Sequence, residues 1–353
     1  MKTNRKRRIP FSVIVLALVL LGVVRQASAQ KEGAADVVAK VVVSDLDAPV
    51  DFSVTADGEV VFIAEQGAQR IRRVQGDANE IVVSEIESAD QLAESIAVHA
   101  VNSHRVLLGL SGFSSAKQAL CLFDMSAQEL PLDFNDDQVE HSKSFERILK
   151  RKELSVLQMF PEQRGLTMVC KSGDAPPTMF DIHFKGGNLD RLSEHKFEAS
   201  TADLSTLAVD QMGGYYAAVP RDNPKQIMFY RAENTLTQSF PTELENIVSM
   251  SFSPIHNRLF ALVGNASKNA LGDSGGDGIY EILADGDGCK SQFVIAIDGA
   301  QKLKFDAQGN AWILCIADAD SRKGLLKKVS GLDVSPAVLA ASADKSESES
   351  DAN

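Results

Sequence analysis

The residues of this 353-residue chain that could do chemistry recur at similar places beside its apolar segments. One set precedes successive apolar segments: Asp47, Glu94, Glu153, Asp203, Asn246 and Asp298. A second set follows the next apolar segment of each repeat: Glu65, Ser111, Lys171, Arg221, Asn265 and Asp318. Carboxylates that share one face concentrate cations and raise one another's pKa values. The two sets therefore predict an acidic face, a funnel with two basic residues. The alternative is that Asp and Asn only shape the turns there.

A glycine-rich segment near residue 273 carries a second chemical signal. Residues 272–276 read Gly-Asp-Ser-Gly-Gly, the nucleophile motif of trypsin-like proteases, but the His and Asp partners of such a serine are not recognisable. Asp273 and Asp277 could instead bind calcium through their oxygens, whereas Asp-Gly turns without metal are the simpler interpretation. The six histidines are scattered without metal-ligand spacing. We therefore predict no cofactor, with Ca²⁺ or another divalent cation at Asp273 and Asp277 as the alternative.

The elements that must position these residues form a repeat. Each unit begins with two apolar residues separated by one residue: Phe52/Val54, Ile96/Val98, Leu157/Met159, Leu207/Val209, Met250/Phe252 and Leu303/Phe305. A turn with Gly or Asn, a second apolar strand and a third strand follow, and several units show a fourth. Short strands repeated at this interval are typical of a β-propeller. The sequence predicts an all-β, six-bladed β-propeller, with a β-sandwich or two small β-domains as the alternative.

The predicted propeller spans residues 30–341. Its blades are expected near residues 46–87, 93–134, 153–198, 203–244, 246–297 and 298–332. The last unit lacks a fourth strand, which residues 37–43 (VVAKVVV) would supply, so that an N-terminal strand closes the ring.

The longest interval between units contains residues 136–154, in which Val139, Phe145, Ile148 and Leu149 fall on one helical face. We expect a short helical insertion there, between blades 2 and 3, with a long connection between these blades as the alternative. Its basic RILKRK cluster either faces solvent or docks an acidic partner.

The two ends of the chain lie outside the repeat. A basic start, an apolar run and the small residues Ala27-Ser28-Ala29 are typical of a secretory signal peptide, residues 1–29, cleaved after Ala29. The alternative is an uncleaved anchor. Residues 342–353 are an acidic tail for which we predict no structure. The sequence therefore predicts an exported protein, periplasmic or extracellular, without a membrane span once the signal is removed.

The charge balance limits the partners. The chain has 36 basic and 48 acidic residues, and loss of the signal leaves 30 against 48. Nucleic acids and anionic membranes would repel such a chain, so we expect a protein or a small cationic ligand as partner. Cys121, Cys170 and Cys315 lie within apolar runs and Cys289 lies in a loop, which predicts free thiols, mostly buried.

Three segments resemble a known family. Residues 48–74, the phrase DAQGNAW of residues 306–312 and the SP segment of residues 251–263 are similar to blades of NHL-repeat and gluconolactonase-like (TolB-like) propellers. The resemblance implies a six-bladed fold, whose activity resides in its loops. Metal-dependent lactonases of this group use a Glu before the first inner strand and Asn and Asp residues on later blades. Asp47 stands near that first position, Gly264-Asn265 replaces the usual acid, and the Asn ligands are not recognisable.

The sequence therefore favours a non-catalytic scaffold of the cell envelope that binds a ligand or a protein. A metal-dependent hydrolase or lactonase that uses the acidic face is the first alternative. A quinone-dependent sugar dehydrogenase is the second, although its His–Gly-rich catalytic phrase is not recognisable.

Overall fold

The computed structural model describes residues 37–333 with gaps, and these residues form strands and turns without an α-helix. The gaps are residues 85, 89–90, 93–94, 112–119, 127–129, 135–144, 150–154, 163–164, 172–177, 197–205, 212–213, 220–225, 231–235, 245, 265–275, 286–287 and 319–321. The predicted signal peptide and acidic tail lie outside the described residues. Within the described part of the chain, no helix has the length and apolarity needed to span a membrane.

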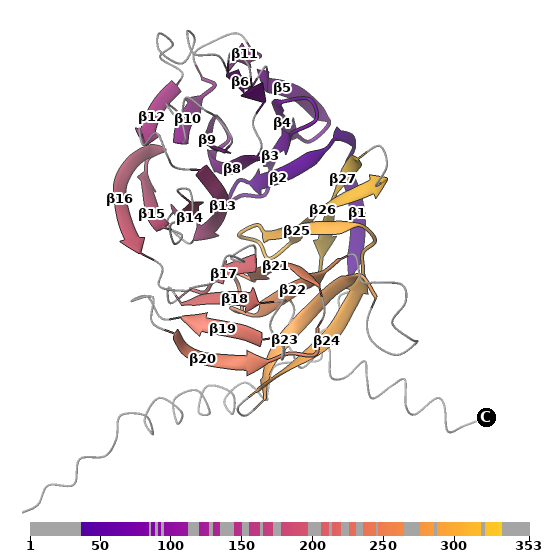
Figure 1. Ribbon diagram of the computed structural model, residues 1–353. Helices are drawn as coiled ribbons and strands as arrows, with labels where there is room; N and C mark the ends of the chain where they lie inside the picture. Colours follow the sequence, from indigo (N-terminus) through magenta and orange to yellow (C-terminus); the bar gives the residue numbers. More distant parts are fainter. Residues whose placement is uncertain are drawn as a thin grey trace, which may run out of the picture. The chain divides into compact units, whose positions relative to one another are not determined.

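The strands form mainly antiparallel sheets, most of them built from consecutive parts of the chain (Figure 1). The innermost strands are β2 (Pro49–Val54), β8 (Ser95–Asn102), β13 (Ser155–Glu162), β17 (Leu207–Val209), β21 (Ile247–Phe252) and β25 (Ala300–Phe305). The second strands are β3 (Val60–Glu65), β9 (Arg105–Ser111), β14 (Gly165–Lys171), β18 (Tyr215–Val219), β22 (Leu259–Val263) and β26 (Ala311–Asp318). The third strands are β4 (Arg70–Gln75), β10 (Leu120–Asp124), β15 (Thr178–Lys185), β19 (Gln226–Tyr230), β23 (Gly278–Asp285) and β27 (Lys323–Ser330). The outer strands are β5 (Ala78–Ser84), β12 (Phe145–Leu149), β16 (Asn188–Lys196), β20 (Leu236–Pro241), β24 (Gly288–Ala296) and β1 (Val38–Asp47).

Five of these sheets have four strands. The sheet of β2 to β5 has a fifth, β11 (Leu132–Asp133), which pairs in parallel with β5, and β6 (Glu87–Ser88) pairs with β7 (Gln91–Leu92) in a small separate sheet. Repeated four-stranded antiparallel sheets of this kind define a β-propeller. The prediction of an all-β propeller is confirmed.

Apolar side chains fill the space between each sheet and the next. Phe52 and Ile63 of the first sheet, for example, share a buried cluster with Trp312 and Leu314 of the last sheet. The innermost strands contact one another in chain order, and β25 also contacts β2. The sheets therefore form a closed ring, and the innermost strands lie around its axis, where a β-propeller has its central channel.

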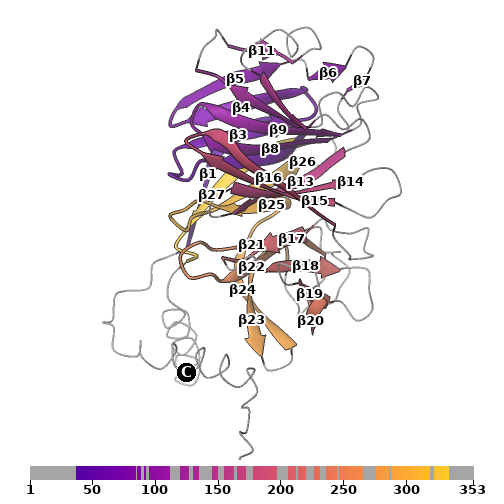
Figure 2. The ribbon, with the colours of Figure 1, turned by 90° about the vertical axis from the view of Figure 1, so that its left-hand side faces the viewer.

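The N-terminal strand completes the last sheet. In β1, Val38 pairs with Ser330 and Asp47 pairs with Lys323 of β27, so the two ends of the fold share one ladder. Figures 1 and 2 show β1, in indigo, beside the yellow β27. Leu46 of β1 is fully buried against the first and last sheets. The predicted closing strand is confirmed, and it extends beyond residue 43 to Asp47.

Residues 145–149 correct one prediction, because they form the strand β12 and not a helix. Phe145 pairs with Phe123 of β10, so β12 is the outer strand of the second sheet. An unpaired edge of β10 would leave backbone groups without partners, and this requirement outweighs a helical periodicity in a five-residue segment. The remainder of the expected insertion, residues 136–144 and 150–154, lies outside the described residues.

The cysteines agree with the prediction of free thiols. None of the four forms a disulfide bond, and Cys121, Cys170 and Cys315 are buried. Burial raises the pKa of Cys315 to about 11, so this thiol stays protonated at neutral pH.

Candidate functional site

A β-bulge recurs near the start of four innermost strands. In β2 the bulge leaves Val50 unpaired directly before Asp51. The same bulge occurs in β13, β21 and β25, directly before Gln158, Ser249 and Lys302 respectively. A bulge bends its strand and changes the direction of the side chains that follow. Asp51, Gln158, Ser249 and Lys302 are therefore equivalent residues of different repeats.

Three of these equivalent residues reach from one innermost strand to the next. Asp51 Oδ2 on β2 accepts a hydrogen bond from the backbone N–H of Val98 on β8, at 2.9 Å. Ser249 Oγ on β21 accepts one from the N–H of Leu303 on β25, at 3.1 Å. Lys302 Nζ on β25 donates to Asp51 Oδ1 at 3.2 Å, which joins the last sheet to the first. The bulges thus direct polar side chains to the interfaces around the channel.

Asp51 is the centre of a buried ion cluster. Lys304 Nζ donates to the same Oδ1 at 2.9 Å and also to the carbonyl oxygen of Phe52. Burial acts to raise the pKa of the Asp51 carboxyl, but Lys302, Lys304 and the Val98 N–H outweigh it and hold that pKa below its usual value. Asp51 is therefore an ionised carboxylate that faces two amino groups.

His99 on β8 lies close to this cluster. Burial, with the nearby charge of Lys304, lowers the pKa of His99 to about 3, so its imidazole is neutral near pH 7. Burial also lowers the pKa of Lys304, against the attraction of Asp51. The Nδ1 atom of His99 is buried without a hydrogen-bond partner among the described residues, and its ring stacks on Phe184 with centroids 6.2 Å apart. A neutral His99 leaves Asp51 as the counter-charge of both lysines.

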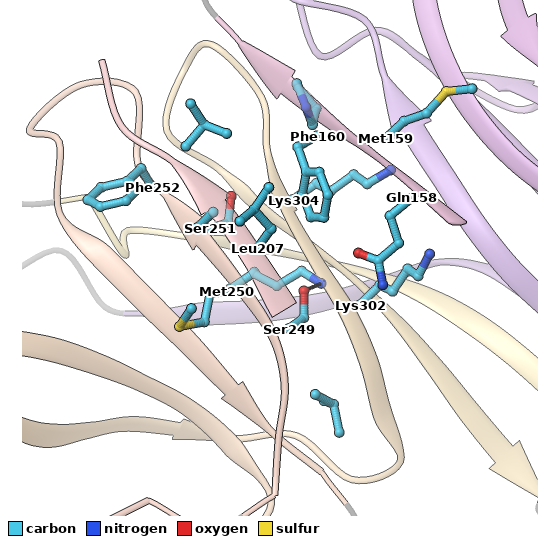
Figure 3. A pocket seen from close by; sticks show the side chains of 15 residues that line it. Gln158, Met159, Phe160, Leu207, Ser249, Met250, Ser251, Phe252, Lys302 and Lys304 are labelled. Carbon is cyan, nitrogen blue, oxygen red and sulfur yellow. Dashed lines mark hydrogen bonds between the residues drawn. The ribbon is translucent and has the colours of Figure 1, made fainter. Parts of the chain in front are cut away.

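A cavity of about 60 Å³ lies beside the ion cluster, between the innermost strands β13, β17, β21 and β25. Figure 3 shows Gln158, Ser249, Ser251, Lys302 and Lys304 among the side chains around it. The rest of its lining is apolar, and none of the lining residues is an acid. A cavity of this size accommodates a few water molecules or a group of a few heavy atoms. We call it the channel pocket.

The described channel residues do not fit the divalent cation that the lactonase resemblance implies. Asp51 Oδ1 accepts from two lysines, and Oδ2 accepts from the Val98 N–H. Ammonium groups at this distance repel a metal ion. Across the described residues, no three His, Cys, Asp or Glu side chains are grouped so that they could hold a metal.

The structure brings together two residues of the predicted acidic face, Asp47 and Glu65. Glu65 is fully buried and accepts the Asp47 backbone N–H at 2.7 Å, Arg70 Nε at 2.7 Å and Arg72 Nε at 2.9 Å. Burial acts to raise the pKa of Glu65, but the hydrogen bonds from Arg70, Arg72 and Asp47 hold it below its usual value. Glu65 is therefore a structural carboxylate between two arginines.

The other predicted residues are described only in part. Asn246 and Asp298 are exposed just before β21 and β25, where Asn246 has a positive φ of 53° that suits a turn. Lys171 and Asp318 end β14 and β26, but their side chains are outside the described residues. Glu94, Glu153, Asp203, Arg221, Asn265 and Asp273 lie outside the described residues altogether. Asp277 is half-buried, and the acidic face and the calcium site stay predictions.

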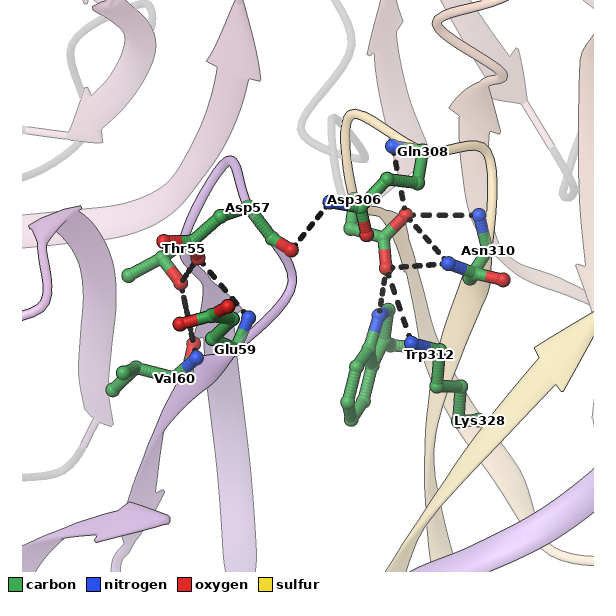
Figure 4. A network of polar contacts seen from close by, with 9 residues as sticks. All are labelled: Thr55, Asp57, Glu59, Val60, Asp306, Gln308, Asn310, Trp312 and Lys328. Carbon is green, nitrogen blue, oxygen red and sulfur yellow. Dashed lines mark hydrogen bonds and ion pairs between the residues drawn. The ribbon is translucent and has the colours of Figure 1, made fainter. Parts of the chain in front are cut away.

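A second polar network joins the turns of the first and last sheets (Figure 4). The Asp306 carboxylate accepts hydrogen bonds from the Asn310 N–H at 2.9 Å and from Trp312 Nε1 at 3.0 Å. Gln308 Nε2 donates to the backbone carbonyl of Asp57 in the neighbouring sheet. The DAQGNAW segment that carries the family resemblance therefore stabilises a turn and anchors a buried tryptophan.

The same turn contact recurs directly after the apolar pair in four repeats. The N–H of Thr55 donates to the carbonyl of Val60, while its hydroxyl accepts the N–H of Val60. Equivalent pairs are Asp210 with Gly214, Ser253 with Arg258, and Asp306 with Asn310. The recurrence shows that these polar residues belong to the fold and not to a site.

Sequence reasoning missed Asp51, His99, Lys302 and Lys304, although a signal was present. Each is adjacent to a member of an apolar pair in the sequence, as Lys304 is to Leu303. Because side chains alternate along a strand, these neighbours face away from the apolar interface. What the sequence could not show is that the strands carrying them meet around one channel.

The repeated four-stranded sheets around the channel pocket place the chain in the β-propeller class. No protein-family model matches the sequence, and no curated protein sequence matches it. Among solved structures, the chain is similar to a luciferin-regenerating enzyme, with 11% identity, 85% of this chain and 97% of that chain covered, and a TM-score of 0.55.

Two further structures are similar to this chain. The similarity to a putative gluconolactonase covers 84% of this chain and 94% of that chain, with 10% identity and a TM-score of 0.52. The similarity to a gluconolactonase from Xanthomonas campestris covers 84% of this chain and 90% of that chain, with 9% identity and a TM-score of 0.50. At these identities the likeness shows the shared fold, a β-propeller, and not an activity.

Proposed function

We propose that the protein is an exported, six-bladed β-propeller of the NHL-repeat or gluconolactonase type. In this proposal it acts as a non-catalytic binding scaffold and holds a ligand in its channel pocket. The sheet of β2 to β5 counts as one of the six blades, because the additional β11 contributes only two residues to its outer edge. Export rests on the signal pattern of residues 1–29.

The observation that carries the proposal is the construction of the channel pocket. Three strands of different sheets each contribute a residue that follows a bulge, namely Gln158, Ser249 and Lys302. Asp51, which supports Lys302, has both carboxylate oxygens engaged, so it is a poor general base. Such a site favours holding a ligand over activating a nucleophile.

Filling the pocket tests the binding role. Ser251→Leu adds apolar volume to the pocket lining, and Ser330→Leu is its control because Ser330 is exposed on β27. Native mass spectrometry of the mature protein from its own host is expected to show a small bound molecule. The bound molecule is retained by Ser330→Leu and lost from Ser251→Leu. Retention in both variants would place the ligand elsewhere and contradict the proposal.

Export has a separate measurement. The intact mass of the secreted protein is expected to correspond to a chain that starts at Gln30. A mass that includes residues 1–29 would show that the segment is retained as an anchor.

A lactone hydrolase is the second candidate, and the likeness to two gluconolactonase structures is the observation that favours it. Its test is hydrolysis of sugar lactones by the purified protein with Ca²⁺, Zn²⁺ or Mn²⁺ added in turn. Metal-dependent turnover that rises with protein concentration would contradict the binding proposal. The catalytic residues would then have to be sought among the residues that the structure does not describe.

A further inference from the structure

We propose that the channel pocket binds a small oxyanion, a carboxylate or phosphate group, and that Lys302 is its main ligand. This inference rests on the proposed function, because it names the chemical class of the ligand that the pocket holds. The oxyanion is either a free small molecule or the charged end of a larger one.

The charges beside the pocket are unequal. The amino groups of Lys302 and Lys304 lie 3.2 Å and 2.9 Å from the same oxygen of Asp51. No acid lines the pocket, and His99 cannot add a negative charge. The two amino groups share this single carboxylate, so the charge of Lys302 is only partly neutralised, and in a protein interior the remaining positive charge attracts an anion more strongly than in water. The local field is therefore cationic, although the whole chain is acidic.

Lys302 is better placed than Lys304 to meet a ligand. The Lys302 side chain is 24% exposed, against 11% for Lys304. Lys304 also donates to the backbone carbonyl of Phe52 and lies over the Phe52 ring at 5.4 Å, so its amino group is already engaged by the first sheet. Lys302 has the longer contact with Asp51, and its ammonium has two further hydrogens to donate.

Neutral donors accompany the charge. Gln158 and Ser251, which line the same pocket, carry an amide and a hydroxyl that suit the oxygens of a carboxylate or phosphate. Hydrogen bonds from an ammonium group to an oxyanion are about twice as strong as those between neutral groups. An anion that accepts from Lys302 and from one of these groups would be held at two points.

Isothermal titration calorimetry at constant ionic strength tests the inference. The titrants are acetate, malonate and inorganic phosphate, with acetamide and methylammonium as neutral and cationic comparisons. At least one oxyanion is expected to bind, and Lys302→Met is expected to weaken it tenfold or more. Lys290→Met is the matched control, because Lys290 is exposed on β24 and pairs only with Asp285 among the described residues. Binding of acetate or malonate without phosphate identifies a carboxylate site, and the reverse result identifies a phosphate site.

The outcomes separate the two proposals. Anion binding that Lys302→Met leaves unchanged overturns the assignment of the site. Binding of acetamide or methylammonium that Ser251→Leu abolishes, without anion binding, overturns the oxyanion class but leaves the pocket as a binding site. If neither these titrants nor the native mass spectra show a ligand, both proposals fail. Should Lys302→Met not fold, Lys302→Arg decides: it keeps the charge and must retain anion binding that Ser251→Leu removes.

Discussion

Lys304 Nζ donates a hydrogen bond to Asp51 Oδ1 at 2.9 Å, although the two residues are 253 positions apart in the sequence. Asp51 lies on the first innermost strand and Lys304 on the last, so the contact crosses the place where the ring closes. The desolvation of two buried charges offsets most of their attraction, and such a pair adds little net stability over an apolar pair. Removing one partner is much more costly, because the other is left as an uncompensated buried charge.

The first prediction concerns this pair. Asp51→Asn leaves Lys302 and Lys304 without a counter-charge and is expected to lower the free energy of unfolding by about 3–5 kcal/mol. Lys323→Met is the control, because Lys323 makes only an exposed contact with Asp47 and should cost less than about 1 kcal/mol. Urea denaturation of both variants measures the difference. Equal effects would show that the buried cluster does not stabilise the ring closure.

The second prediction concerns how β1 is held. Leu46→Ala leaves a cavity between the first and last sheets and is expected to lower the free energy of unfolding by about 2–5 kcal/mol. Val41→Ala on the same strand should change it by no more than about 0.5 kcal/mol, because Val41 is 48% exposed. Urea unfolding compares the two. A loss at Val41 as large as that at Leu46 would contradict the described burial of β1.

The third prediction concerns the two ends. Removal of residues 30–44 takes away most of β1 and exposes the edge of β27, so the melting temperature should fall and aggregation should increase. Removal of the tail from Ser342 onward should leave the melting curve unchanged. Coincident melting curves for the first truncation and the mature chain would show that β1 is dispensable.

The fourth prediction uses the single tryptophan of the chain as a reporter. Asp306→Ala leaves Trp312 Nε1 and the Asn310 N–H without their acceptor, at a cost of about 1–3 kcal/mol for the buried indole N–H. We expect a shifted fluorescence emission at neutral pH and a lower urea midpoint. The exposed Asp298→Ala is the control and should change neither. An unshifted emission in Asp306→Ala would show that the indole environment does not depend on this carboxylate.

The fifth prediction is a pH dependence that originates at His99. The unfolded chain takes up a proton at this residue near its ordinary pKa of 6.5, whereas burial in the folded state, with the charge of Lys304, lowers the pKa to about 3. The unfolded state therefore binds more protons between these two values, and stability falls as the pH falls through that window. The expected slope reaches about 1.4 kcal/mol per pH unit.

His99→Phe removes this term, so its stability relative to the wild type should rise steadily from pH 7 to pH 4 in urea unfolding experiments. His104→Phe, at an exposed turn, serves as the control and should show no such trend. Parallel pH profiles for wild type and His99→Phe would contradict the buried neutral imidazole.

The sequence by itself determined the all-β propeller class and the strand that closes the ring. Apolar pairs such as Phe52/Val54, the turn residues that follow them and the β-rich segment from Val37 are local features, and local alternation is enough to specify a strand and its buried face. The burial of Cys121, Cys170 and Cys315 also followed from their apolar neighbours.

Only the tertiary structure decided how polar residues combine. Phe145 to Leu149 form a strand because they pair with the open edge of β10. The five residues themselves contain no pattern that predicts this pairing. Glu65 was predicted at an acidic face, but it is buried. Two arginines of β4 neutralise its charge, and the backbone N–H of Asp47 donates a further hydrogen bond to its carboxylate. The Asp51–Lys304 contact joins strands at opposite ends of the chain. Its existence depends on the number of sheets, the bulges that direct the side chains and the closure of the ring, all of which are properties of the assembled fold.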